Sequence, residues 1–394
     1  MVPVTMSALS SGYRCMVCGK LVTQRAEPCH LTAGESESET HRNVCAIGCQ
    51  TLVWACCAMS ATIKDIAQRA GVSTSTVSHV VNGTRYVSDA LRARISEVMR
   101  ELDYRPNSLA RSLRVRESRT IGLVVPDNTN PFFAEVSRAI EDIGFHEGYS
   151  VFLCNSDGRV EKERAYVNSL VTKRVDGIIF ITCGGAIEPL QELIRHDTPV
   201  VVVDREVPLS LADLVLLDNR TGGQLATRHL ISLGHRRIGC ITGPSTLTPS
   251  ADRVLGYREA LKEADIPAKP EWIVGGDFRP AGGEAGIREL LDLPYAPTAV
   301  FACNDLMAIG ALRAIRSAGL NVPADVSIVG FDDIPLASEV VPPLTTVAQP
   351  VEEMARIAVG LLLSRISDER DLTQTERHVL TPLLVEREST AKPK

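Results

Sequence analysis

The sequence predicts a small all-α head joined to an α/β body of two lobes, each built on a doubly wound parallel sheet. Residues 62–102 show helical periodicity, whereas short apolar, β-rich runs alternate with helical stretches after residue 120. The charge changes at the same boundary, because residues 60–119 carry 11 basic and 6 acidic side chains and residues 120–394 carry 27 and 38. A basic segment on a chain of net charge −6 indicates a polyanionic partner for that segment alone.

Length and composition bound the remaining possibilities. With 394 residues the chain is too long for one typical core of about 100–200 residues, so we expect two or three domains. No run of about 18 uncharged apolar residues occurs, which argues against a membrane span. We divide the chain into an N-terminal extension at 1–59, a head at 60–105, a linker at 106–119, a two-lobed body at 120–388 and a tail at 389–394.

The N-terminal extension is rich in cysteine. Seven of the eleven cysteines lie there, at Cys15, Cys18, Cys29, Cys45, Cys49, Cys56 and Cys57. Zinc ligation or a redox pair is one interpretation, but the spacings match no compact zinc finger. We expect instead a disordered extension, or upstream sequence translated because the start was assigned too early. The four cysteines of the body are scattered through apolar runs, which is typical of a reduced, intracellular protein.

Three helices are predicted in the head. Thr62 is placed to cap the first helix, and Gly71 ends it. A second short helix is expected at 73–81 and a third at 88–102, with apolar positions three and four residues apart facing a small core. The turn at Gly71 makes the first two helices a helix-turn-helix, a motif whose second helix lies in the major groove of DNA. The outer face of that helix carries small polar side chains, namely Thr74, Ser75, Ser78 and His79.

The head resembles the lactose-repressor family of bacterial transcription regulators. The run from Thr62 to Asn82 reads Thr-Ile-Lys-Asp-Ile-Ala-x-x-Ala-Gly-Val-Ser-x-x-Thr-Val-Ser-x-Val-x-Asn, a long and specific pattern. The match is nearest to the purine and ribose branch of the family, in which a histidine, here His79, stands where other branches commonly have an arginine. The resemblance implies a homodimer, with a tetramer left open, that reads a pseudo-palindromic operator in the cytoplasm, at the nucleoid.

The linker carries a second motif of this family. The segment Tyr104-Arg-Pro-Asn-Ser-Leu-Ala-Arg-Ser-Leu113 contains a proline suited to a helix start, and the arginines at 111–119 suit phosphates. By resemblance it is the hinge helix, which orders on DNA and inserts Leu113 between base pairs of the minor groove. Without the resemblance it is a basic linker. The DNA contacts implied for head and linker are Thr62, Ser73, Thr74, Ser75, Thr76, Ser78, His79, Asn82, Asn107, Ala110, Arg111, Leu113 and Arg114.

Polar and aromatic side chains follow the predicted strands of the body. In open α/β sheets the carboxyl ends of the strands border the ligand crevice, so these residues are candidates for a binding site. Carboxylates, amides and arginines beside aromatic rings suit a polyol, since they hydrogen-bond hydroxyls and cover the C–H faces of a sugar. We find no phosphate loop, no nucleophile triad and no metal-ligand spacing in the body, and therefore predict no enzyme, no cofactor and no metal.

The body resembles the periplasmic-binding-protein-like sugar-binding fold that the repressor family shares. Ten positions carry the residue type that contacts ribose in the periplasmic ribose-binding protein: Asn130, Phe132, Phe133, Asp204, Arg205, Arg253, Phe278, Asn304, Asp332 and Gln349. Thr182 departs from that pattern, because an asparagine is expected there, and the change could shift hydroxyl recognition. Asp305 resembles the family's inducer-domain aspartate, which supports the crevice.

The resemblance implies a transcriptional repressor whose operator affinity falls when D-ribose closes the two lobes. Two alternatives stay open. In the first, the same architecture takes a purine base as corepressor, so operator affinity rises with ligand. In the second, the chain is a solute-binding protein or an enzyme with an incidental helical head, and the basic linker counts against it.

Overall fold

The chain folds as two compact units, Met1–Pro106 and Asn107–Lys394. The computed structural model describes residues 61–82, 85–104, 117–182, 184, 187–367 and 375–394, together with the backbone of three strands near the N-terminus. The hinge-helix positions Asn107, Ala110, Arg111, Leu113 and Arg114 lie outside the described residues. No helix in the described part of the chain is long and apolar enough to cross a membrane.

The three N-terminal strands form an antiparallel sheet that the sequence analysis did not anticipate. They are β1 (Ala8–Leu9), β2 (Gly12–Val17) and β3 (Lys20–Gln24), in the order β1-β2-β3. The side chains of this sheet and the rest of residues 1–59 lie outside the described residues. The expectation of a disordered or mis-assigned extension therefore stays a prediction, and the cysteine site stays the alternative to it.

The predicted head helices are present as α2 (Ile63–Ala70), α3 (Thr74–Asn82) and α4 (Asp89–Glu101). A capping box begins α2, because the Thr62 hydroxyl accepts from the Asp65 N–H and the Asp65 carboxylate accepts from the Thr62 N–H. Gly71 ends α2 in the left-handed conformation, at φ 62°. Ile66, Ala67, Ala70, Val77, Ile95 and Val98 form a small buried core, so the three helices hold one another in place.

The N-terminal lobe is an all-parallel six-stranded sheet in the order β14-β8-β7-β6-β4-β5. Its strands are β4 (Thr120–Val125), β5 (Ser150–Asn155), β6 (Gly177–Phe180), β7 (Val200–Val203), β8 (Asp213–Leu217) and β14 (Arg377–Leu380). Its helices are α6 (Pro131–His146), α7 (Val160–Lys173), α8 (Glu188–Arg195) and α14 (Val351–Ile366). The continuous burial of β6, β7 and β8 is typical of a parallel sheet covered on both faces.

The C-terminal lobe has a second six-stranded sheet in the order β10-β9-β11-β12-β13-β15, in which β15 alone is antiparallel. Its strands are β9 (Ile238–Thr242), β10 (Ile273–Gly275), β11 (Ala299–Ala302), β12 (Ser327–Asp332), β13 (Thr345–Ala348) and β15 (Leu383–Val385). Its helices are α9 (Asn219–Ser232), α10 (Thr248–Glu263), the short η1 (Pro270–Trp272), α11 (Pro280–Leu291), α12 (Asp305–Ser317) and α13 (Pro335–Glu339).

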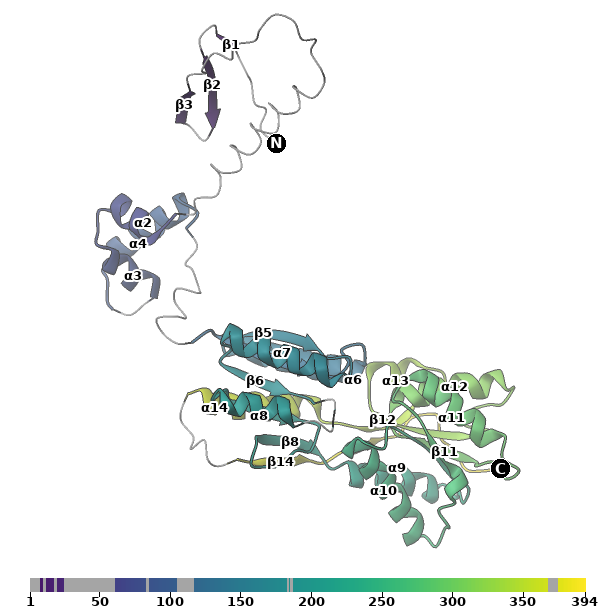
Figure 1. The fold of residues 1–394 in the computed structure, drawn as a ribbon. Coiled ribbons are helices and arrows are strands. Elements are labelled where there is room, and N and C mark those ends of the chain that lie inside the picture. The colour runs from purple at the N-terminus through teal and green to yellow at the C-terminus, as the bar shows by residue number, and fades with distance from the viewer. Residues whose placement is uncertain are drawn as a thin grey trace, which may run out of the picture. The chain divides into compact units, whose positions relative to one another are not determined.

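The lobes are interleaved in sequence. The chain passes into the C-terminal lobe after β8, returns to the N-terminal lobe as α14 and β14, and crosses again to form β15. Figure 1 shows the yellow α14 and β14 among the teal elements of the N-terminal lobe. A buried ion pair fastens the returning helix, because Arg365 of α14 binds the fully buried carboxylate of Asp213 at the start of β8.

The segment at 389–394 packs on the C-terminal lobe, where Ser389 is buried and His235 donates to the Ala391 carbonyl at 2.9 Å.

Helices α9 and α10 touch through two glycines. A Cβ at Gly256 would lie 2.0 Å from the Arg220 carbonyl oxygen, and one at Gly223 would lie 2.1 Å from the Arg253 carbonyl oxygen. Backbone therefore packs directly on backbone, and this contact fixes the position of α10.

We predict that Gly256→Ala lowers the free energy of unfolding by about 1–3 kcal/mol, because the added methyl group must push α9 and α10 apart. Gly360→Ala is the control, since it lies in α14 with no atom within 4 Å of the new Cβ, and alanine should add about 0.5–1 kcal/mol there. Urea denaturation followed by circular dichroism measures both. Equal midpoints for the two variants would contradict the close-packing argument.

Candidate functional site

A cavity of about 690 Å³ lies between the two lobes of the body. Of the eleven predicted effector residues, ten line it: Asn130, Phe132, Phe133, Asp204, Arg205, Arg253, Phe278, Asn304, Asp332 and Gln349. A second cavity of about 350 Å³ includes only Asp204 of this set. The residues that the sequence pattern singled out therefore converge on one interlobe space.

Helix starts place several of these side chains. Asn130 caps α6 by accepting from the Phe132 N–H at 3.1 Å, and Asn304 caps α12 by accepting from the Met307 N–H at 2.9 Å. Asn304 also donates to the Phe278 carbonyl at 3.0 Å. Both asparagines thus have a structural role besides any contact with a ligand.

Three aromatic rings border the cavity. The rings of Phe132 and Phe133 lie with their centroids 5.1 Å apart, both on the first turn of α6. Phe278 comes from the other lobe with a left-handed backbone, at φ 64°, and its ring occupies the space that a side chain at Gly243 would need. Flat apolar surfaces from both lobes therefore face one ligand-sized space, which suits stacking against a sugar or a planar base.

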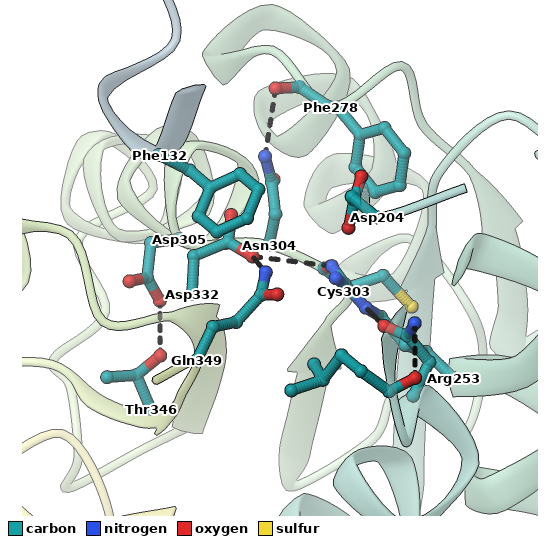
Figure 2. Close-up of polar contacts among 12 residues, drawn as sticks. Phe132, Asp204, Arg253, Phe278, Cys303, Asn304, Asp305, Asp332, Thr346 and Gln349 are labelled. Carbon is teal, nitrogen blue, oxygen red and sulfur yellow. Dashed lines mark hydrogen bonds and ion pairs between the residues drawn. The ribbon is translucent and has the colours of Figure 1, made fainter. Parts of the chain in front are cut away.

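Arg253 is the central buried charge of the site. Its Nε donates to Asn219 Oδ1 at 2.8 Å, and its Nη1 donates to the Cys303 carbonyl at 2.6 Å and lies 3.5 Å from Asp332 Oδ1 (Figure 2). The guanidinium carbon lies 3.6 Å from the centroid of the Phe331 ring, so the group stacks on it. Burial lowers the pKa of Arg253, and the nearby carboxylates of Asp332 and Asp204 oppose that effect.

Asp332 is the titratable acid of the cavity. Burial raises its pKa to about 7, although Arg253 and the hydrogen bond from Gln349 favour the charged form. Gln349 donates from Nε2 to Asp332 Oδ1 at 2.7 Å. Because this pKa lies near neutral, a ligand that hydrogen-bonds to the carboxylate would change its protonation state.

Asp204 and Arg205 form a buried ion pair at the end of β7, and Asp204 adopts a left-handed φ of 66°. The Arg205 guanidinium lies 5.9 Å from the Phe133 ring centroid. Among the described residues, three buried side-chain atoms lack a hydrogen-bond partner, and all three belong to the cavity: Asp204 Oδ1, Arg205 Nε and Gln349 Oε1. Two acceptors and one donor on residues that line the cavity therefore have no partner within the protein.

Asp305 lies behind the cavity and holds its wall. It is fully buried, and its two carboxylate oxygens accept from the Thr346 hydroxyl at 2.6 Å and from the Ile334 N–H at 2.9 Å. Burial and the nearby Asp332 raise the pKa of this carboxyl well above its usual range. The aspartate thus ties β13 and the segment after Asp332 to the start of α12.

Thr182 lies outside the cavity lining in the described structure. The Thr182 hydroxyl donates to Glu163 of α7 at 3.2 Å and accepts from the Gly184 N–H. Thr182 and Glu163 are both buried in the N-terminal lobe. Sequence reasoning also missed residues that do line the cavity, including Asp127, Leu247 and Arg279. Two of them had a usable signal, since Asp127 follows β4 and Arg279 follows Phe278.

The predicted DNA contacts of the head lie on α3 and just before it, except Thr62, which caps the start of α2. Thr62, Ser73, Thr74 and Ser75 are exposed, and Thr76, Ser78, His79 and Asn82 are half-buried. Ser73 starts the helix by accepting from the Thr76 N–H at 3.1 Å, and Asn82 donates to the Ser78 carbonyl at 2.8 Å. These positions form a polar face of the kind a recognition helix presents.

We predict that Asp305→Ala lowers the free energy of unfolding by about 2–4 kcal/mol, because the Thr346 hydroxyl and the Ile334 N–H lose their acceptor in the core. Asp305→Asn should retain most of the stability, since an amide can accept from the backbone and donate to the hydroxyl. Thermal unfolding of both variants measures the difference. Equal losses would show that the negative charge, not the hydrogen bonding, is what the site requires.

Two family profiles match this chain. "Bacterial regulatory proteins, lacI family" covers residues 62–107, and "Periplasmic binding protein-like domain" covers residues 227–390. The ribose operon repressor of Escherichia coli K12 is 43% identical over 331 residues, which are 84% of this chain and 99% of that protein. The PurR repressor of Edwardsiella ictaluri is 44% identical over 336 residues, 84% of this chain and 97% of that one.

Solved structures agree with this relation. The lac repressor dimer bound to operator and an anti-inducer has a TM-score of 0.76 at 29% identity, covering 84% of this chain and 100% of its own. A regulator of the same family from Enterococcus faecium, with bound ribose, has a TM-score of 0.64 at 36% identity, covering 70% of this chain and 100% of its own. The match extends over head and body, and the predicted fold class is confirmed. The chain belongs to the lacI family of bacterial regulatory proteins, DNA-binding repressors with an effector-binding domain and not enzymes.

Proposed function

We propose that this repressor is released from its operator by D-ribose, bound in the cavity between the lobes. The observation that carries the proposal is the set of three unpartnered buried atoms, Asp204 Oδ1, Arg205 Nε and Gln349 Oε1. A sugar hydroxyl both donates and accepts, so vicinal hydroxyls can satisfy a neighbouring carboxylate and guanidinium at once. The aromatic rings of Phe132, Phe133 and Phe278 would then cover the sugar's C–H faces.

The charge of the cavity favours a neutral ligand. Its lining holds five carboxylates and three guanidiniums, namely Asp127, Asp157, Asp204, Asp277 and Asp332 with Arg205, Arg253 and Arg279. An added phosphate would meet net repulsion, so we infer that the effector is a free sugar and not a sugar phosphate. Support also comes from the ribose-bound regulator of Enterococcus faecium and the ribose operon repressor of Escherichia coli.

A purine corepressor is the second candidate, because PurR proteins are as similar to this chain as the ribose operon repressor is. The aromatic rings and Arg253 suit a base as well as a sugar. The buried Asp204–Arg205 pair favours the sugar, since it offers a charged acceptor and a charged donor to hydroxyls on one side of the cavity.

We propose that a homodimer places two heads on a pseudo-palindromic operator. The similar lac repressor, solved as a dimer bound to operator, supports this proposal. The face of α3 with Thr74, Ser75, Ser78 and His79 would read the major groove, and Leu113 of the hinge would enter the minor groove. Ribose would favour the arrangement of the lobes that separates the hinge helices. A ligand shifts such an equilibrium only by its differential affinity for the two states, typically about 1–3 kcal/mol.

We predict that millimolar D-ribose weakens operator binding by roughly five- to 150-fold, the range that this coupling energy allows. Fluorescence anisotropy with DNA from the chain's own upstream region measures the effect. Arg205→Ala should lose the response and keep operator affinity, whereas Arg228→Gln, an exposed control in α9, should keep both. Tightening by hypoxanthine or guanine would move the protein to the corepressor class, and loss of operator binding by Arg205→Ala would contradict the assignment of that residue.

The protonation of Asp332 gives a second prediction. A hydroxyl that donates to the carboxylate binds the ionised form, so ribose affinity should rise as pH passes upward through the pKa of about 7. If binding lowers that pKa by one unit or more, affinity at pH 8 should exceed affinity at pH 6 by roughly five- to tenfold. Isothermal titration calorimetry of wild type and Asp332→Asn tests it, because the amide should flatten the profile. A wild-type affinity that falls with rising pH would have the wrong sign.

A further inference from the structure

An ion pair bridges the two lobes at the lining of the effector cavity. Arg279 Nη2 of the C-terminal lobe lies 3.7 Å from Asp127 Oδ2 of the N-terminal lobe, and both residues line the cavity. The other ion pairs described for the body join residues of the same lobe, as Arg228–Glu263 and Arg377–Glu206 do. Relative motion of the lobes would therefore break this pair and leave those intact.

Local hydrogen bonds hold Asp127 and Arg279 where their side chains can meet between the lobes. Asp127 Oδ1 accepts from the Thr129 N–H at 3.0 Å and from the Thr129 hydroxyl at 2.6 Å, which leaves Oδ2 for the arginine. The Arg279 N–H donates to Asp277 Oδ1 at 2.8 Å, immediately before α11 begins at Pro280. Each partner is thus held on a fixed turn of its own lobe, so the distance between them reports how far the lobes are apart.

A second, apolar contact joins the lobes. A Cβ at Gly184 of the N-terminal lobe would lie 2.5 Å from Leu247 Cδ2 of the C-terminal lobe, and Leu247 also lines the cavity. The Leu247 side chain therefore lies against the backbone of the other lobe, and the ion pair adds a charge-dependent contact between the lobes. With side chains 68% and 29% exposed, that contact must weaken as salt screens it.

We propose that Asp127 and Arg279 are positioning residues that hold the lobes closed over the effector, so that binding of an uncharged sugar becomes dependent on ionic strength. The inference rests on the proposed function for the identity of the ligand. Exposed pairs contribute up to about 1 kcal/mol, which corresponds to a change in Kd of up to about fivefold. The pair would act mainly on release, because the lobes must part before the sugar leaves.

Isothermal titration calorimetry with D-ribose, without DNA, tests the proposal on wild type, Asp127→Asn, Arg279→Gln and the double variant. We expect each single variant to bind ribose two- to fivefold more weakly, and the double variant to be no weaker than the singles. Raising KCl from 0.05 to 0.5 M should weaken wild type by a similar factor and leave the three variants unchanged. Arg228→Gln, which breaks the exposed α9–α10 pair with Glu263, should behave as wild type.

Direct contact between Arg279 and the sugar is the alternative to a positioning role, and it predicts a different pattern of affinities. If Arg279 contacted the sugar directly, Arg279→Gln would weaken binding far more than Asp127→Asn and the losses would add, which would overturn the proposal. X-ray scattering without sugar gives an independent measurement, since breaking the pair should open the lobes and raise the radius of gyration relative to Arg228→Gln. An unchanged radius would also overturn it. Absence of ribose binding by wild type would instead refute the proposed effector, and the scattering would still decide the role of the pair.

Discussion

The candidate effector site depends on the buried guanidinium of Arg253. A charge removed from water is tolerated only where partners replace its hydration, and here Asn219, the Cys303 carbonyl, Asp332 and the face of Phe331 do so. These partners come from α9, the end of β11 and the end of β12. The position of Arg253 therefore requires that several strand ends of the C-terminal lobe meet correctly. Asp332 pairs with this guanidinium, and Gln349 in turn donates to Asp332.

Close packing keeps that network in register. Arg253 lies on α10, three residues before Gly256, and the backbone contact between α9 and α10 leaves little freedom for the helix to shift. On the far side, Asp305 ties both β13 and the segment after Asp332 to the start of α12, with one hydrogen bond to each. The Arg253 network of the site thus belongs to the C-terminal lobe, whereas the N-terminal lobe supplies Phe132, Phe133 and the Asp204–Arg205 pair. A ligand that touches both halves would bias their relative position, which is the physical requirement for an effector.

Interleaving of the chain also couples the lobes to each other. Three crossings connect them, and the helix that follows the second crossing, α14, is fastened to the N-terminal sheet by the buried Arg365–Asp213 pair. Movement of one lobe is therefore transmitted through short, well-anchored connections near the cavity. The pairing of Asp127 with Arg279 adds a contact that forms only when the lobes approach, so closure has both an apolar and a screened electrostatic component.

Local patterns in the sequence predicted the fold class, the head helices and polar residues at the strand ends, and the family resemblance singled out the eleven candidate effector residues, ten of which line the cavity. They could do so because capping, helical periodicity and polar strand ends are encoded by neighbours along the chain. Only the tertiary structure decided the rest. It turned Thr182 toward Glu163, placed α14 and β14 in the N-terminal lobe, and packed residues 389–394 on the C-terminal sheet. It also brought Asp127 within reach of Arg279. Contacts between residues on different elements, whether 19 positions apart like Thr182 and Glu163 or 152 like Asp127 and Arg279, depend on how whole elements pack, and no local pattern of residues specifies that.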